Sequence, residues 1–292
     1  PDLHELMAIA DILITDYSNI MFEFAAAGKP VFLFAPDLSA YSQKNIFYFD
    51  VGTLPFPCVQ TQEDLLEAMH SLDIKAYRQK TQAFFAEHVG LRESGRASQA
   101  AAAAAVDKLT SAVVHTIMPD GSIRKGIVQD ETPPAIISSL YDKYHAFPID
   151  SKKLVFINFH GRGYGCNPKY IAQEMLKRRS DLDLVWMARG NASLPQGVRS
   201  VPYDSEQAIM EIATARVLID NTMMFTGFKK RPDQFYVNTW HGAIPLKKIG
   251  FDNPANKKSK NYEARNACNF PHVDLMLSNS RFASNMYRRA FG

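Results

Sequence analysis

A histidine between a tryptophan and a glycine is the residue of this sequence best suited to proton transfer. The segment VNTWHGAIPLKKIGFD places His241 at the end of a short apolar stretch. An imidazole with a pKa near ~6.5 can accept a proton from a hydroxyl group at neutral pH. Gly242 would let a substrate approach closely, and Lys247 and Lys248 could neutralise phosphate charge. The alternative is a structural histidine in a turn.

A second polar corner lies near the N-terminus, in ADILITDYSNIMFEFAAAGKP. An apolar strand ends there in Asp16, Tyr17 and Ser18, and a helix is expected to begin at Asn19. The N-terminus of a helix offers free backbone N–H groups and a positive dipole end, which suit a phosphate. Glu23 could accept hydrogen bonds from a ribose or another diol. The alternative is that Asp16 and Ser18 only cap the helix, because both residue types are common N-caps.

A glycine-rich turn, HGRGYG, follows the apolar stretch at 154–158. Its glycines fall at positions 161, 163 and 165, so the third comes one place too early for the G-x-G-x-x-G fingerprint of dinucleotide-binding proteins. The next apolar stretch, LDLVWMARG, ends in Arg189 and carries no acidic residue that could hold a ribose. Nicotinamide binding is therefore disfavoured, with an NADP phosphate on Arg189 as the alternative.

The remaining pattern predicts an α/β protein. Short apolar stretches alternate with helical periodicity in both halves, which is typical of parallel, doubly wound sheets. Three stretches, ADILITDYSN, ARVLIDNTMM and VDLMLSNSRF, each run from an apolar strand into a polar corner. The expected strands are 12–15, 31–34, 154–158, 182–187, 216–219, 234–237 and 273–277, and the expected helices are 3–9, 19–27, 62–70, 74–88, 97–106 and 168–179.

The segment 116–152 contains Asp-Gly and Pro-Pro and has no sustained period, which indicates a linker. We therefore expect one lobe at 1–115 and a second at 153–292. Charge divides in a similar way. Up to residue 150 the chain has 11 Lys and Arg and 19 Asp and Glu, and after residue 150 it has 22 Lys and Arg and 11 Asp and Glu. The basic second half favours an anionic partner, with two unrelated surfaces as the alternative.

The three cysteines, Cys58, Cys166 and Cys268, show neither metal-ligand spacing nor a disulfide pattern. We therefore expect no metal site, and a reducing cytoplasm as the compartment. The sequence shows no signal peptide and no apolar run near ~18 residues, which argues against a membrane span.

Three motifs together resemble one family. TWHGAIPLKKIGFD resembles the Trp-His-Gly-Thr-Pro-Leu-Lys motif of the CDP-glycerol glycerophosphotransferases, bacterial enzymes that prime and extend poly(glycerol phosphate) teichoic acids and related capsule polymers. FHGRGYGCNPKYIAQEML looks like the family's first strand-turn-helix, and ADILITDYSNIMFEFAAAGKPVFLFAPDLSAY looks like its nucleotide-binding half. Two departures are Asn19, where the family commonly has Ser, and Ala243-Ile244 in place of a single Thr.

The resemblance implies two Rossmann-like lobes of a GT-B fold. Residues 1–115 would be the C-terminal, CDP-glycerol-binding lobe of one module, and 153–292 the N-terminal, acceptor lobe of the next. This order reverses that of a single module, so a tandem protein is the simplest account, and the two motifs then need not share an active site. A circular permutation, in which both halves pack on each other, is the alternative.

The resemblance also implies the chemistry. A hydroxyl of a lipid-linked or polymeric acceptor would attack the glycerol-bearing phosphate of CDP-glycerol, and CMP would leave, without a tightly bound metal or other cofactor. His241 would be the general base, with Asp16 as a second catalytic residue. The implied substrate contacts are Tyr17, Ser18, Asn19, Glu23 and Lys29 in one lobe and Trp240, Gly242, Lys247 and Lys248 in the other.

Members of this family work at the inner membrane face, so a peripheral position on an anionic membrane surface is expected, with no nucleic acid partner. Lys257, Lys258 and Lys260 would contribute to that contact. Two rival interpretations stay open: a GT-B glycosyltransferase that uses another nucleotide-activated donor, and a tandem copy that binds without catalysing.

Overall fold

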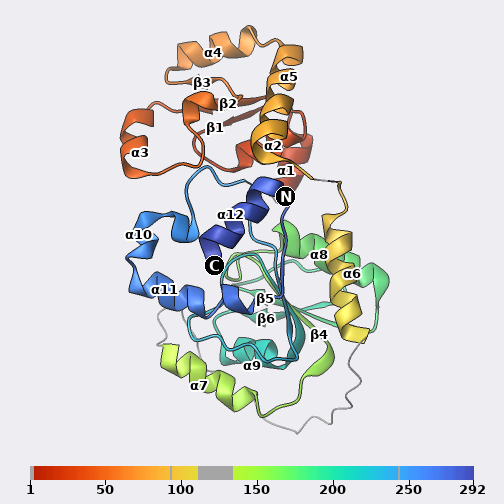
Figure 1. Ribbon diagram of the computed structural model, residues 1–292. Helices are drawn as coiled ribbons and strands as arrows, with labels where there is room; N and C mark the ends of the chain where they lie inside the picture. The colour runs from red at the N-terminus through yellow and green to blue at the C-terminus, as the bar shows by residue number, and fades with distance from the viewer. Residues whose placement is uncertain (1–2, 93, 111–133, 243) are drawn as a thin grey trace.

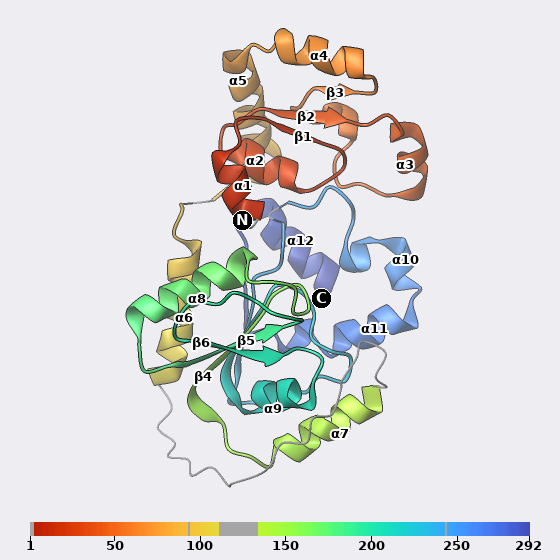
Figure 2. The ribbon, with the colours of Figure 1, turned by 180° about the vertical axis from the view of Figure 1, so that it is seen from behind.

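The computed structural model describes residues 3–92, 94–110, 134–242 and 244–292. Two parallel sheets, each with helices packed on it, form two lobes that lie one above the other in Figures 1 and 2. The predicted α/β class with Rossmann-like lobes is therefore confirmed.

The smaller lobe is built on a three-stranded parallel sheet in the order β1 (Leu13–Thr15), β2 (Val31–Phe34) and β3 (Cys58–Val59). Phe22 on α2 (Ile20–Ala26) and Phe32 on β2 are both fully buried, so the connection from β1 to β2 that contains α2 packs into the lobe. Thr61 caps the helix expected at 62–70, because its hydroxyl accepts a hydrogen bond from Asp64 N. The helices are α1 (Leu3–Ile9), α2 (Ile20–Ala26), α3 (Leu38–Lys44), α4 (Gln62–His70) and α5 (Ile74–Phe84), with a 3-10 turn η1 (Val51–Thr53) and a π-helical turn η2 (Phe85–Val89).

The larger lobe carries a six-stranded sheet in the order β6-β5-β4-β7-β8-β9, and every pairing is parallel. Counted along the chain from its first strand, this is the order 3-2-1-4-5-6 of doubly wound dinucleotide folds. The winding reverses between β4 and β7, and ligands of such sheets bind at this switch point, beyond the carboxyl ends of the strands. The strands are β4 (Asp150–Ile157), β5 (Asp183–Ala188), β6 (Val198–Pro202), β7 (Ala215–Asp220), β8 (Phe235–Asn238) and β9 (Leu275–Met276).

Helices cover both faces of the larger sheet. On one face α6 (Ala97–Thr110) and α8 (Cys166–Arg178) pack over strand residues such as Phe156 and Trp186. On the other face α7 (Pro134–Tyr144) and α9 (Glu206–Thr214) pack over the alternate strand residues. The remaining elements are α10 (Pro254–Lys257), α11 (Lys260–Ala267), α12 (Arg281–Phe291) and the 3-10 turns η3 (Gly250–Asp252) and η4 (Phe270–His272). In Figure 1, α12 lies where the two lobes meet.

The structure places the lobe boundary earlier than the sequence suggested. Helix α6 falls in the segment assigned to the first lobe, yet Ala101, Ala102 and Ala105 pack into the core of the larger sheet. Part of the expected linker is also wrong: 134–144 forms α7, and β4 begins at Asp150. The other part, 116–133, lies outside the described residues. Helix formation in α6 follows from local propensity, whereas the sheet that it covers is decided by tertiary packing.

Backbone hydrogen bonds join the lobes at two places. Tyr48 N donates to Leu246 O and Lys248 N donates to Ile46 O, both at 2.8 Å, around an antiparallel bridge between Phe47 and Lys247. A second antiparallel bridge pairs 91 with 280, where the backbone of Arg281 donates to Gly90 O at 3.0 Å. Loop segments of the smaller lobe are therefore bonded directly to loop segments of the larger lobe.

Candidate functional site at the lobe interface

Three buried asparagines stand at the carboxyl ends of adjacent strands. Asn158 follows β4, Asn221 follows β7 and Asn238 ends β8, and each is at most 3% exposed. The Asn221 amide donates to Asn158 Oδ1 at 2.9 Å and accepts from Phe159 N at 2.8 Å. Asn238 Oδ1 accepts the backbone N–H of Trp240 at 2.8 Å. These amides hold the two loops that carry HGRGYG and WHG.

The same loops hold their residues in an unusual backbone conformation. Phe159, His160 and Trp240 have φ angles of +42°, +56° and +50°, in the left-handed region that non-glycine residues rarely adopt. Each such residue costs about 1–3 kcal/mol and persists where neighbouring groups over-determine the geometry. The buried asparagines supply that restraint, so the structure maintains strain at this point of the sheet.

His241 is oriented by one of these strand ends. Its Nδ1 lies 2.6 Å from the carbonyl oxygen of Asn221. Since a carbonyl oxygen only accepts, Nδ1 carries the proton and Nε2 is the basic nitrogen. Burial lowers the pKa of His241, although the bond to Asn221 and the charge of Glu23 oppose this effect. The ring also stacks on Trp240, with 4.5 Å between centroids. A neutral, oriented imidazole can act as a general base.

Asp220 is the last residue of β7, directly before Asn221, and it is fully buried. Its Oδ1 accepts from Thr222 N at 2.9 Å and from Thr222 Oγ1 at 3.0 Å. Burial raises the pKa of Asp220 to about 6, although these hydrogen bonds oppose the rise. The carboxyl group therefore braces the corner after β7 and has no route to a substrate.

In the smaller lobe, the Asp16–Asn19 corner is only partly as expected. Asp16 and Ser18 are exposed, as a ligand site needs. Tyr17 is buried instead: its hydroxyl donates to Asp37 at 2.9 Å and its ring stacks on Tyr41 at 3.7 Å. The direct substrate contact expected of Tyr17 stays a prediction, although its hydroxyl already donates within the lobe.

Asn19 and Glu23 face the other lobe. Asn19 is the N-cap residue of α2, but its side chain makes no capping bond, and its Oδ1 accepts from Leu246 N at 2.8 Å. A Cβ added at Gly242 would lie 3.4 Å from Asn19 Nδ2. Glu23 is close enough to act on the pKa of His241. The structure thus brings together two motifs that lie more than two hundred positions apart. The alternative in which Asp16 and Ser18 only cap α2 is not supported, because the N-cap residue is Asn19.

Lys29 has a structural role and not the expected substrate contact. Its ammonium donates to the carbonyl oxygens of Met7, Ala8 and Ala10 at 2.9, 2.8 and 2.7 Å. These carbonyls end α1, where a cation is favourable. Lys29 also precedes β2, so it lies at the amino end of that strand, whereas ligands of parallel sheets gather at the carboxyl ends.

The lysine pair lies on the strand that joins the lobes. Lys247 is exposed, and its ammonium donates to Tyr41 Oη at 3.0 Å. Lys248 is half-buried, and its backbone N–H makes the interlobe bond to Ile46. Both lysines therefore lie on the interlobe segment that follows the WHG turn in the chain. Ala243, one of the two departures from the family motif, lies outside the described residues.

The residues that sequence reasoning missed are the three asparagines. The sequence did contain a signal for Asn221, because ARVLIDNTMM is one of the three stretches that run from an apolar strand into a polar corner. The sequence alone does not distinguish a buried amide from a solvated one. Within 3–92, 94–110, 134–242 and 244–292, no group of three His, Cys, Asp or Glu side chains could hold a metal. In the same residues no helix is both long and apolar enough to cross a membrane.

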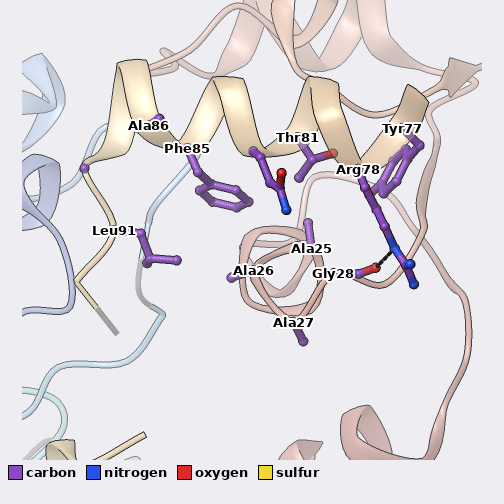
Figure 3. A pocket seen from close by; sticks show the side chains of 12 residues that line it. Ala25, Ala26, Ala27, Gly28, Tyr77, Arg78, Thr81, Phe85, Ala86 and Leu91 are labelled. Atoms are coloured by element: carbon purple, nitrogen blue, oxygen red, sulfur yellow. Dashed lines mark hydrogen bonds between the residues drawn. The ribbon is translucent and has the colours of Figure 1, made fainter. Parts of the chain in front are cut away.

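A cavity of about 570 Å³ lies elsewhere, between α2 and α5 (Figure 3). Its wall includes Ala26, Thr81, Phe85 and Leu91, and none of the predicted site residues. It also faces the C-terminal end of α2, away from the carboxyl ends of the strands. The predicted site residues therefore lie outside the lining of this cavity.

Comparison with known proteins gives a consistent family. The sequence model of CDP-glycerol:poly(glycerophosphate) glycerophosphotransferase matches residues 1–104 and 139–292. Teichoic acid poly(glycerol phosphate) polymerase of Bacillus subtilis (strain 168) is 37% identical over 163 residues, which are 52% of this chain and 21% of that protein. Teichoic acid glycerol-phosphate transferase of Staphylococcus aureus is 36% identical over 102 residues, which are 34% of this chain and 26% of that protein.

The match thus spans about a fifth to a quarter of the length of these relatives. Among solved structures, the wall teichoic acid polymerase TagF aligns with a TM-score of 0.48 and 23% identity, over 54% of this chain and 40% of that one. The family model covers both lobes and most of the chain. The chain therefore belongs to the CDP-glycerol:poly(glycerophosphate) glycerophosphotransferase family.

Proposed function

We propose that this chain transfers glycerol phosphate from CDP-glycerol to a hydroxyl group of a lipid-linked or polymeric acceptor, with release of CMP, in teichoic acid or capsule polymer synthesis. One observation carries the proposal. His241 is a neutral base with Nδ1 bound to Asn221, and it faces the Asn19 and Glu23 corner across the lobe interface. The family to which the chain belongs supplies the substrate class.

In this mechanism His241 Nε2 takes the proton of the acceptor hydroxyl. The resulting oxygen nucleophile attacks the phosphorus of the glycerol-bearing phosphate, and the bond from that phosphorus to the oxygen of CMP breaks. Lys247 and Lys248 offset the negative charge that the reacting phosphates carry, and Asp16, Ser18 and the start of α2 contact the donor. Removal of a general base lowers such rates by about 10²–10⁴-fold.

The arrangement of two Rossmann-like lobes around this site supports a GT-B enzyme. Either of two chain organisations fits: a tandem protein whose neighbouring modules contribute one lobe each, or a permuted single module. Because Asn19 accepts a hydrogen bond from Leu246 N and a Cβ added at Gly242 would lie 3.4 Å from its amide nitrogen, a site shared by both lobes is the proposal that this geometry favours.

The proposed place of action is the inner face of the bacterial membrane, as a peripheral protein. Lys257, Lys258 and Lys260 are exposed on α10 and α11, as a contact with anionic lipid requires. Sedimentation with vesicles should increase with anionic lipid content and fall with salt. Binding that ignores both would contradict this location.

The central test is calorimetric titration of the chain with CDP-glycerol, with CMP and NADPH as controls. We expect CDP-glycerol and CMP to bind, and a Ser18→Ala/Glu23→Ala variant to lose that binding. CMP release in the presence of a glycerol phosphate acceptor should then fall about 10²-fold or more in His241→Gln. His272→Gln is the matched control, since His272 is exposed on η4. A loss below about threefold in His241→Gln would remove His241 from the mechanism.

The two rival functions are separated by the same assays. If the enzyme uses another nucleotide-activated donor, that donor would bind in competition with CMP, and the chain would release no CMP from CDP-glycerol. A tandem copy that binds without catalysing would bind CDP-glycerol and release no CMP.

A further inference from the structure

The switch point of the larger sheet carries a second histidine that the proposed mechanism does not use. The connection after β4 leads to α8 on one face, and the connection after β7 packs Met224 and Phe225 into the core on the other face. His160 stands in the first of these loops. In doubly wound sheets, the crevice between two such diverging loops is where anionic ligands bind.

His160 is held in place on both sides of its ring. Nδ1 lies 3.3 Å from Tyr203 Oη, and Nε2 lies 3.5 Å from an Nη of Arg265 on α11. The loop passes directly against Tyr203, because a Cβ at Gly161 would come within 2.6 Å of that side chain and only glycine fits there. The imidazole is thus fixed between a hydroxyl group and a guanidinium group at the carboxyl edge of β4.

Arg265 is the unusual member of this cluster. It is half-buried, and in the described part of the chain its guanidinium forms no ion pair with a carboxylate. Several other arginines of the lobe have acidic partners: Arg179 with Asp181, Arg189 with Asp204, Arg199 with Asp183 and Glu211, and Arg289 with Asp252. A guanidinium has five N–H donors in a planar fork that matches phosphate oxygens. One donor points at His160, so the others stay available to an anion.

We propose that Arg265, positioned by His160, forms a phosphate-binding subsite at the β4–β7 switch point, beside the His241 loop. The two loops touch, because the Phe159 ring meets the His241 ring edge-on at 5.2 Å. Under the proposed function, on which this inference rests, the phosphate is either part of the CDP-glycerol diphosphate or a phosphodiester of the acceptor. Its role is to fix the position of that phosphate relative to His241.

The test uses three probes against the intact chain: inorganic phosphate, CDP-glycerol and glycerophosphoglycerol, which is a phosphodiester. Affinities are measured by calorimetry for wild type, Arg265→Gln and Arg178→Gln. Arg178 is the matched control because it pairs with Glu174 near the other end of α8 and its loss changes the charge equally. We expect Arg265→Gln to weaken binding about tenfold or more, as is typical for a lost charge-assisted bond, and Arg178→Gln to match wild type.

The probe that responds identifies the source. A loss confined to CDP-glycerol assigns the subsite to the donor, and a loss confined to glycerophosphoglycerol assigns it to the acceptor. Imidazole signals of His160 in NMR spectra of the wild type should shift on addition of the same probe. Equal affinities in all three proteins, or His160 signals that do not move, would overturn the subsite.

The outcome is separable from that of the proposed function. Binding of phosphate that depends on Arg265 without any CMP release would refute the transferase and leave the subsite standing. CMP release together with phosphate binding that does not change in Arg265→Gln would support the transferase and refute the subsite. Arg265→Lys serves as a second variant, since it keeps the charge but loses the fork, and it should bind with intermediate affinity.

Discussion

Replacement of Asp220 by asparagine should change how the stability of the larger lobe responds to pH. Asp220 is fully buried, and its carboxyl group accepts hydrogen bonds from Thr222 and from Tyr236 Oη at 3.4 Å. Burial raises its pKa from 3.8 to about 6. Between these values the folded protein keeps the proton while the unfolded chain has lost it.

The sign and size of the effect follow from this difference. Because the folded-state pKa is raised, the stabilisation by this proton is complete below about pH 4 and is lost as the pH rises through about 6. One pKa unit corresponds to about 1.36 kcal/mol, so the shift of Asp220 amounts to about 3 kcal/mol of unfolding free energy. The Asp220→Asn variant does not titrate, yet it keeps the shape and the acceptor for Thr222.

The assay is urea unfolding of wild type, Asp220→Asn and Asp142→Asn at several values between pH 4 and pH 7.5. The stability of wild type relative to Asp220→Asn should fall by about 3 kcal/mol across this interval. Asp142→Asn is the control, because Asp142 is exposed and paired with Lys229 on the surface, and its curve should follow wild type within about 0.5 kcal/mol. Parallel curves for wild type and Asp220→Asn would refute a buried, protonated carboxyl group at this position.

Three further predictions concern His241, Lys29 and Asn221. Burial lowers the pKa of His241, so the acidic limb of the rate of CMP release should lie below about pH 6.5, and a limb above pH 7 would contradict a neutral base. Lys29→Met should lower the unfolding free energy by about 1–3 kcal/mol and leave the affinity for CDP-glycerol within about twofold, whereas a tenfold loss would restore its substrate role. Asn221→Ala should cost about 2–4 kcal/mol in urea unfolding, because it strands Phe159 N and Asn158 Oδ1, and a cost equal to that of exposed Asn285→Ala would show that the amide holds nothing.

Features with a local cause were predictable from the sequence. The strand 31–34 was expected with the bounds that the structure gives it, because four apolar residues follow a Gly-Lys-Pro turn. The helix at 62–70 was also expected with the bounds that the structure gives it, and Thr61, three residues before Asp64, caps it. By contrast β6, VRSVP, escaped notice because an edge strand with exposed Arg199 and Ser200 lacks a continuous apolar run. The recurrence of Ile137, Tyr141 and Tyr144 marked α7, but the Asp-Gly and Pro-Pro nearby obscured it.

For the site, the sequence by itself determined which residues could do chemistry and which strand end each one follows, because residue type and apolar periodicity are written locally. It placed His241, Asp16 and Ser18 at strand ends, and it supplied a family through three motifs. Only the tertiary structure decided which groups stay available. The hydroxyl of Tyr17 and the ammonium of Lys29 are held by Asp37 and by the end of α1, contacts that depend on folding of the whole lobe.

The tertiary structure also decided that the two motifs meet. The bond from Leu246 N to Asn19 Oδ1 joins residues separated by 227 positions, and no local pattern encodes a pairing over that distance. The same holds for Asn158, Asn221 and Asn238: each looks like an ordinary polar residue in the chain, and only burial at neighbouring strand ends makes them a frame for the histidine loops. Residue chemistry is a property of the sequence, whereas orientation and burial depend on contacts that the complete fold creates.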